Sequence, residues 1–169
     1  DLQPILSGIQ SQIHRTWYNF HQWNGLSDSG KMPANDLHLT AEWTARNDTK
    51  YHVEHYRTNV EETEYLWYET EEFTWTTDTE ACPVPKEYVW FKPVESVKTW
   101  NIAPDGSLVI RYDYNRVAYT LTYDVKWGTP ITGENPVPVK FEVPINTWFT
   151  STKTGYDFSG WDLKWNERS

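Results

Sequence analysis

The sequence predicts a mainly β protein that folds as an antiparallel barrel or, alternatively, as a two-sheet β-sandwich, with one amino-terminal helix. First, apolar and polar residues alternate with period two from residue 37 onward, whereas helical periodicity is confined to residues 1–14. Second, about ten short alternating segments are separated by turn residues, which is typical of barrels and sandwiches. Third, 11 Trp and 11 Tyr supply bulk to a chain poor in aliphatic residues. The core is therefore expected to be aromatic.

The helix is expected over residues 1–14. Pro4 suits a first helical turn, because its missing N–H would have no partner there. Leu and Ile residues at positions 2, 5, 6, 9 and 13 form one apolar stripe at helical spacing. The aromatic residues 16–23 either extend this helix or begin the first strand, and Asn24-Gly25 supplies a turn.

Most of the chain after residue 37 is expected to be strands. Alternation predicts them at residues 37–44, 51–58, 65–69, 73–75, 88–91 and 97–102. Pro83 and Pro85 stiffen a connection that does not suit a central strand, because proline cannot donate to the ladder. Later strands are predicted at 137–143, at 148–149 and at 161–165.

Residues 106–127 are expected to form a β-hairpin at the centre of the fold. On its first arm Ile110, Tyr112 and Tyr114 share one face with Leu108, and on its second arm the alternation runs from residue 119 to 127. Residues 113–116, Asp-Tyr-Asn-Arg, supply the turn, since Asp and Asn favour turn conformations.

Length and composition predict one domain over residues 1–169 and exclude several classes. A net charge of −9 argues against a nucleic-acid partner, and no apolar run is long enough to span a membrane. The single Cys82 excludes an internal disulfide and a cysteine-based zinc cluster. The first residue, Asp1, indicates upstream processing or truncation, so secretion stays possible and the compartment open. Asn47 matches the N-glycosylation pattern, but this pattern alone does not show that the protein is secreted.

No catalytic motif is present, and no cofactor or metal is predicted. The sequence has no glycine-rich phosphate loop, no Gly-x-Ser-x-Gly elbow and no His-Glu-x-x-His helix. His52 and His55 are three residues apart in a predicted strand, so they point to opposite faces and cannot bind one ion together. Whether the protein is an enzyme stays open at this stage.

Ionisable residues on inward faces are the candidates for a site. If Val53 points inward so do His55 and Arg57, and if Trp67 points inward so does Glu69. These groups either sit at strand ends, where they reach water or pair with each other, or they orient a small ligand in an apolar pocket. The predicted ligand-binding set is His55, Arg57, Trp67, Glu69, Tyr112 and Tyr123. His55 and Glu69 are also the candidates for general acid–base catalysis.

Residues 61–80 contain eight acidic side chains, and no Lys or Arg lies between Arg57 and Lys86. Such a run is typical of a solvated sheet edge that discourages aggregation. Two other interpretations are cation binding by the clustered carboxylates and sugar binding by carboxylates beside exposed rings.

The start of the chain resembles the lipocalins and other calycins. In that family a helix precedes a Gly-x-Trp motif and successive antiparallel strands; here the motif position reads Arg15-Thr16-Trp17, without the glycine. The resemblance implies a cup-like barrel that binds a small, largely apolar or aromatic ligand, and barrels of this kind also host isomerases and cyclases. The competing hypothesis is a secreted β-sandwich that binds or cleaves polysaccharide, and a third is a structural or interaction domain. A barrel would bury most Trp rings around a cavity, whereas a sugar-binding protein would expose several.

Overall fold

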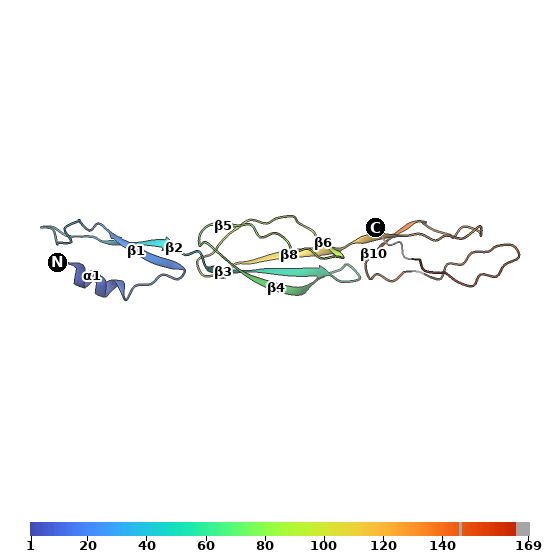
Figure 1. The fold of residues 1–169 in the computed structure, drawn as a ribbon, viewed down its shortest axis with the longest axis horizontal. Coiled ribbons are helices and arrows are strands. Elements are labelled where there is room, and N and C mark those ends of the chain that lie inside the picture. The colour runs from blue at the N-terminus through green and yellow to red at the C-terminus, as the bar shows by residue number, and fades with distance from the viewer. Residues whose placement is uncertain (146, 165–169) are drawn as a thin grey trace.

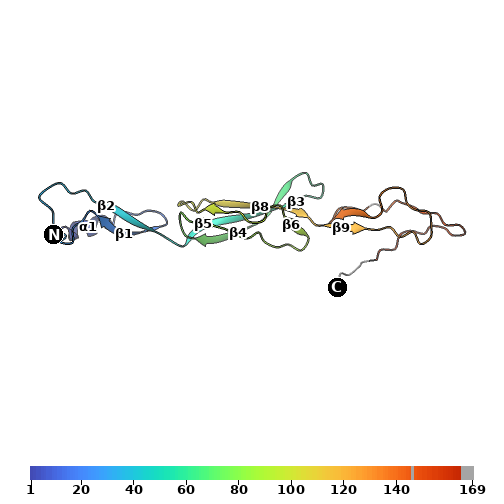
Figure 2. The same ribbon diagram turned by 90° about the horizontal axis from the view of Figure 1, so that it is seen from above.

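The structure is a computed structural model that describes residues 1–145 and 147–164. The protein is elongated, and three β-structured parts follow one another along its length (Figure 1, Figure 2). The predicted mainly β architecture with one amino-terminal helix is confirmed. The described strands form one four-stranded and three two-stranded sheets, and none of these sheets closes into a barrel. The barrel prediction is therefore wrong for the described residues, because each sheet keeps two unpaired edges.

The amino-terminal part consists of helix α1 (Gln3–Gln10) and the antiparallel strands β1 (Tyr18–Asn24) and β2 (Thr40–Ala45). The helix is shorter than predicted, and Leu6 is its only buried residue. Ser and Gly are poor helix formers, and Gly8 and Ser11 fall where the helix ends. The ambiguous aromatic segment after the helix is a strand, β1.

The central sheet has the order β4-β3-β8-β6. Its strands are β3 (Thr49–Thr58), β4 (Tyr65–Trp75), β6 (Phe91–Pro93) and β8 (Val109–Arg116). Strands β3 and β4 are antiparallel neighbours joined by residues 59–64, whereas β3 and β8 pair in parallel. The other described strand pairs are antiparallel, as predicted, and this parallel pair is the exception.

The predicted hairpin over residues 106–127 is not formed. Residues 113–116 belong to β8, and the chain then continues into β9 (Ala118–Leu121), which pairs with β10 (Val137–Lys140) in the carboxy-terminal part. The turn-forming residues are held in the strand by partners: Arg111 donates to Asp113 over 2.7 Å, and the Tyr65 hydroxyl donates to Asn115 over 2.7 Å. Alternation correctly assigned the faces of this segment but could not identify its neighbours.

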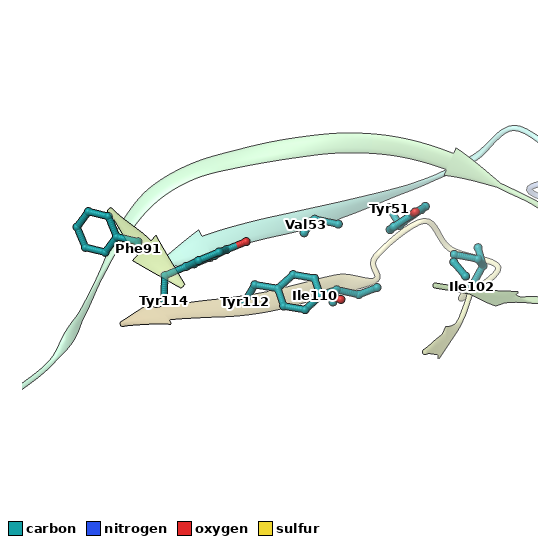
Figure 3. Packing of buried hydrophobic residues seen from close by; sticks show 8 residues of the cluster. Tyr51, Val53, Phe91, Ile102, Ile110, Tyr112 and Tyr114 are labelled. Carbon is teal, nitrogen blue, oxygen red and sulfur yellow. The ribbon is translucent and has the colours of Figure 1, made fainter. Parts of the chain in front are cut away.

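The core lies on the face that β3 and β8 share (Figure 3). The two-stranded sheet of β5 (Glu80–Ala81) and β7 (Trp100–Asn101) contributes to the same cluster through Ala81 and the adjacent Ile102. The prediction that Ile110, Tyr112 and Tyr114 share one buried face is confirmed. The buried members of the cluster are Tyr51, Val53, Ala81, Phe91, Ile102, Ile110, Tyr112 and Tyr114.

Other predicted strands change their limits. Segments 65–69 and 73–75 are one strand, β4. The segments predicted at 97–102 and 137–143 contract to β7 and β10, whereas the strand predicted at 88–91 is displaced to β6 and shares only Phe91 with it. Residues 148–149 and 161–164 are not strands, and residue 165 lies outside the described residues. The single domain stays a prediction.

Candidate functional site

The central sheet brings together most of the predicted ligand-binding set on its buried face. His55 pairs in register with Tyr112 on β8 and with Glu69 on β4. Arg57 lies two residues further along β3, on the same face. Trp67 and Tyr123 lie elsewhere.

His55 is fully buried, and both of its ring nitrogens have partners. Nδ1 lies 2.9 Å from the Tyr114 hydroxyl, and Nε2 lies 3.0 Å from a carboxylate oxygen of Glu71. An ionised Glu71 accepts the Nε2 proton, which leaves Nδ1 to accept the hydrogen of Tyr114. The imidazole is therefore satisfied by its neighbours and needs no ligand.

Glu69 is held by Lys86 and Tyr88, from the segment that precedes β6. The Lys86 ammonium lies 3.1 Å from Glu69 and 3.2 Å from Glu71, so it bridges the two carboxylates. The Tyr88 hydroxyl also donates to Glu69. This hydrogen bond, together with Lys86, lowers the pKa of Glu69, and the bond to Glu69 raises the pKa of Lys86. Glu69 therefore stays ionised near neutral pH, which does not suit a general acid.

Burial also changes the acidity of the two tyrosines in this network. It raises the pKa of Tyr114 to about 12. Burial, and then the hydrogen bond to Glu69, raises the pKa of Tyr88. Both hydroxyls therefore remain protonated donors throughout the physiological range.

Arg57 is surrounded by aromatic rings in place of a carboxylate. Its guanidinium carbon lies 3.2 Å from the ring centroid of Tyr68, 4.0 Å from that of Tyr88 and 4.8 Å from that of Phe91. Its buried Nε makes no hydrogen bond among the described residues. The attraction between a cation and ring faces offsets part of the cost of this burial.

Tyr112 also has a structural role, because its hydroxyl connects two segments of the chain to the central sheet. Its hydroxyl donates to the Pro83 carbonyl over 2.6 Å and accepts from the Lys98 backbone N–H over 3.0 Å. These two bonds attach the proline-rich connection and the segment before β7 to the central sheet.

Trp67 does not share a face with Glu69, and the prediction that it does is wrong. A register shift between His55 and Tyr56 leaves Tyr68 without a partner on β3, so that Trp67 pairs with Tyr56 instead. This β-bulge reverses the alternation along β4. Trp67 is 62% exposed, and its Nε1 donates to Thr70 over 3.1 Å.

Tyr123 lies in the carboxy-terminal part, against the rings of Phe149 and Trp161 at 5.5 and 5.1 Å between centroids. Together with Trp161 it borders an open cavity of about 520 Å³ between residues 121–128 on one side and residues 145, 147 and 151–164 on the other. This volume falls within the range of small-molecule sites, roughly 300–1,000 Å³. Neither His55, Arg57 nor Glu69 borders this cavity.

The lining of the carboxy-terminal cavity combines rings with charges of both signs. Trp161 is fixed by a hydrogen bond of 2.7 Å from Nε1 to the Phe149 carbonyl. Tyr156 is 70% exposed, with the Lys153 ammonium 4.4 Å from its ring centroid. The ring-bearing residues are Tyr123, Tyr156, Phe158 and Trp161, and the charged ones are Asp124, Lys126, Lys153, Asp157, Asp162 and Lys164.

The carboxylates of this cavity are suited to accepting hydrogen bonds. The backbone N–H of Lys126, followed by its side chain, lowers the pKa of Asp124, so that this group stays ionised. Asp157 and Asp162 make no hydrogen bond or ion pair among the described residues, and their oxygens are uncommitted. The sequence signal for this site was the segment 156–162, Tyr-Asp-Phe-Ser-Gly-Trp-Asp, in which rings and carboxylates are interleaved.

The acidic run over residues 61–80 behaves as a sheet edge with ionic partners. Glu72 lies 2.8 Å from Lys50 and 3.5 Å from His52, on the face opposite to His55. Lys140 pairs with Glu62 over 2.5 Å. Within the described residues, no group of three or more His, Cys, Asp or Glu side chains could hold a metal ion.

Comparison with protein-family models, with curated proteins and with solved structures gives no match to this chain. No helix within residues 1–145 and 147–164 has the length and apolar character needed to cross a membrane.

Proposed function

We propose that this protein binds carbohydrate and that the carboxy-terminal cavity holds a sugar. The observation that carries the proposal is the combination of exposed rings and uncommitted carboxylates around one open cavity of about 520 Å³. The apolar C–H face of a sugar packs on an aromatic ring, while its hydroxyls donate to carboxylates and accept from ammonium groups. Tyr156 supplies an exposed ring and Trp161 a half-buried one, and Asp157 supplies an acceptor.

The distribution of tryptophan supports this hypothesis over an apolar ligand enclosed by a barrel. The side chains of Trp67 and Trp148 are 62% and 90% exposed, and no described sheet is closed. The carboxy-terminal cavity carries six charged side chains, which an apolar ligand would leave without hydrogen-bonding partners.

Tyr156→Ala tests the proposal. The side chain is 70% exposed, so its removal should leave the fold intact. Stacked rings gain about 0.5–1.5 kcal/mol beyond area burial, and 1.4 kcal/mol is a factor of ten. We therefore expect roughly two- to twelvefold weaker binding, measured as retention on insoluble cellulose, chitin and xylan. Reducing ends released from the same polysaccharides report whether the bound sugar is also cleaved.

Trp127→Ala is the matched control, because this ring is 93% exposed at the same end of the molecule but does not border the cavity. It should change retention by less than twofold. Failure of the wild-type protein to bind any of the three polysaccharides would reject carbohydrate binding. Equal losses in the two variants would reject the cavity as its location.

A further inference from the structure

A second cavity lies at the opposite end of the elongated molecule. It has a volume of about 390 Å³ and is bordered by α1, by β1 and by residues 26–30. Figure 1 shows α1 and β1 at one end and β10 towards the other, with the central sheet between them. The two cavities therefore face separate surroundings.

The lining of this amino-terminal cavity is polar and almost uncharged. Its rings are Phe20 and Trp23, whose centroids lie 5.3 Å apart. Its other lining residues include Gln3, Ser7, Gln10, Gln22, Ser27 and Asp28, and no Lys, Arg or His is among them. A ligand that offers both hydrogen-bond donors and acceptors matches these amides and hydroxyls. An anion would be repelled by the Asp28 carboxylate and would find no cationic side chain to bind it.

Several polar groups here have no partner within the described residues. The side-chain amides of Gln3 and Gln10 make no hydrogen bond there. The indole Nε1 of Trp23 is buried and also lacks an acceptor. A buried donor without a partner costs free energy, so an oxygen that reached Nε1 would remove that cost. Since Nε1 is closed to solvent in this structure, its engagement requires Trp23 to move.

We infer that the amino-terminal cavity is a second carbohydrate site, specific for a neutral saccharide, and that the protein is bivalent. This inference rests on the proposed function. Rings supply a stacking surface, and uncommitted amides match hydroxyl groups that both donate and accept. Because the two sites lie at opposite ends of the molecule, one protein binds two polysaccharide chains and links them. Linked binding events also raise the overall affinity for a polymer above that of either site.

Gln10→Ala tests the second site. Alanine favours the helix, and the Gln10 side chain has no described hydrogen bond to lose, so the fold should be preserved. Isothermal titration with the hexasaccharides of cellulose, chitin and xylan measures the stoichiometry. We expect two sites in the wild type, the amino-terminal one at least tenfold weaker after Gln10→Ala, and the carboxy-terminal one weakened in Tyr156→Ala while the amino-terminal one is unchanged. The double variant should lose the ability to make a soluble polysaccharide turbid by cross-linking.

Gln12→Ala is the control, because Gln12 lies just beyond the helix and its amide bonds to the Gly8 carbonyl instead of bordering the cavity. It should leave both sites unchanged. One site in the wild type, unaffected by Gln10→Ala, would overturn the second site and leave the proposed function standing. If Gln10→Ala lost all binding and Tyr156→Ala lost none, both the carboxy-terminal site and bivalency would be overturned. No hexasaccharide binding by the wild type would overturn both proposals.

Discussion

Replacing Tyr114 by Phe removes one buried hydroxyl and keeps the ring that packs in the core. The Tyr114 side chain is fully buried, and its hydroxyl lies 2.9 Å from His55 Nδ1. The same hydroxyl accepts the backbone N–H of Lys86. The substitution therefore leaves an acceptor on His55 and a donor on Lys86 without their partner.

The expected loss follows from those orphaned groups. A buried polar group that loses its only partner costs about 1–3 kcal/mol. His55 is fully buried, whereas Lys86 lies on a half-buried segment whose N–H water can reach more easily. We therefore expect the free energy of unfolding to fall by about 1–3 kcal/mol, most of it from the imidazole.

Urea denaturation, followed by tryptophan fluorescence, measures the change at unaltered m value. Tyr119→Phe is the matched control, because this tyrosine is 44% exposed and its hydroxyl makes no hydrogen bond within the described residues. It should cost less than about 0.5 kcal/mol. Equal, small losses in the two variants would refute the closed network around His55.

Two further predictions concern the same sheet. Ile110→Ala should destabilise the protein by about 2–5 kcal/mol, because this side chain is 1% exposed. Val109→Ala, on the other face and 49% exposed, should cost under about 0.5 kcal/mol. Equal losses of stability in urea denaturation would contradict the assignment of faces. The pKa of Tyr114 is raised from 10.0 to about 12, so its contribution is complete below pH 10 and is lost as the pH rises through about 12. Thermal melting should show this loss, and it should be smaller in Tyr114→Phe.

The sequence predicted which residues face the core better than it predicted how the strands pair. Alternation placed Ile110, Tyr112 and Tyr114 on one buried face because side-chain direction follows from local geometry. Pairing depends on contacts between distant segments, and nothing local in residues 109–114 indicates a parallel partner at residues 52–57. The turn-forming Asp113 and Asn115 were misleading because side-chain partners hold them in a strand.

In the candidate site too, local features could be predicted from the sequence, whereas contacts between distant segments could not. The inward groups His55 and Glu69 do have partners, as one interpretation expected, but these partners are not each other: they come from β4, β8 and the segment before β6. The bulge at Tyr68 could not be anticipated, since an extra residue in a strand leaves no distinct sequence signal, and it separated Trp67 from Glu69. The carboxy-terminal cavity is built from irregular loops, to which periodicity does not apply.

The parallel pairing of β3 with β8 has a consequence for synthesis on the ribosome. Strand β4 follows β3 after a short connection and can cover one edge of β3 early, by a local contact. The other edge must wait until residue 116 has emerged, several seconds later at about 5–20 residues per second. During that interval the nascent chain carries a ten-residue strand with an open side, which other chains can join. Until then, only the charged side chains of β4 and the prolines that precede β8 oppose such association. The protein is therefore most prone to aggregate if synthesis is delayed or stops between residues 59 and 108.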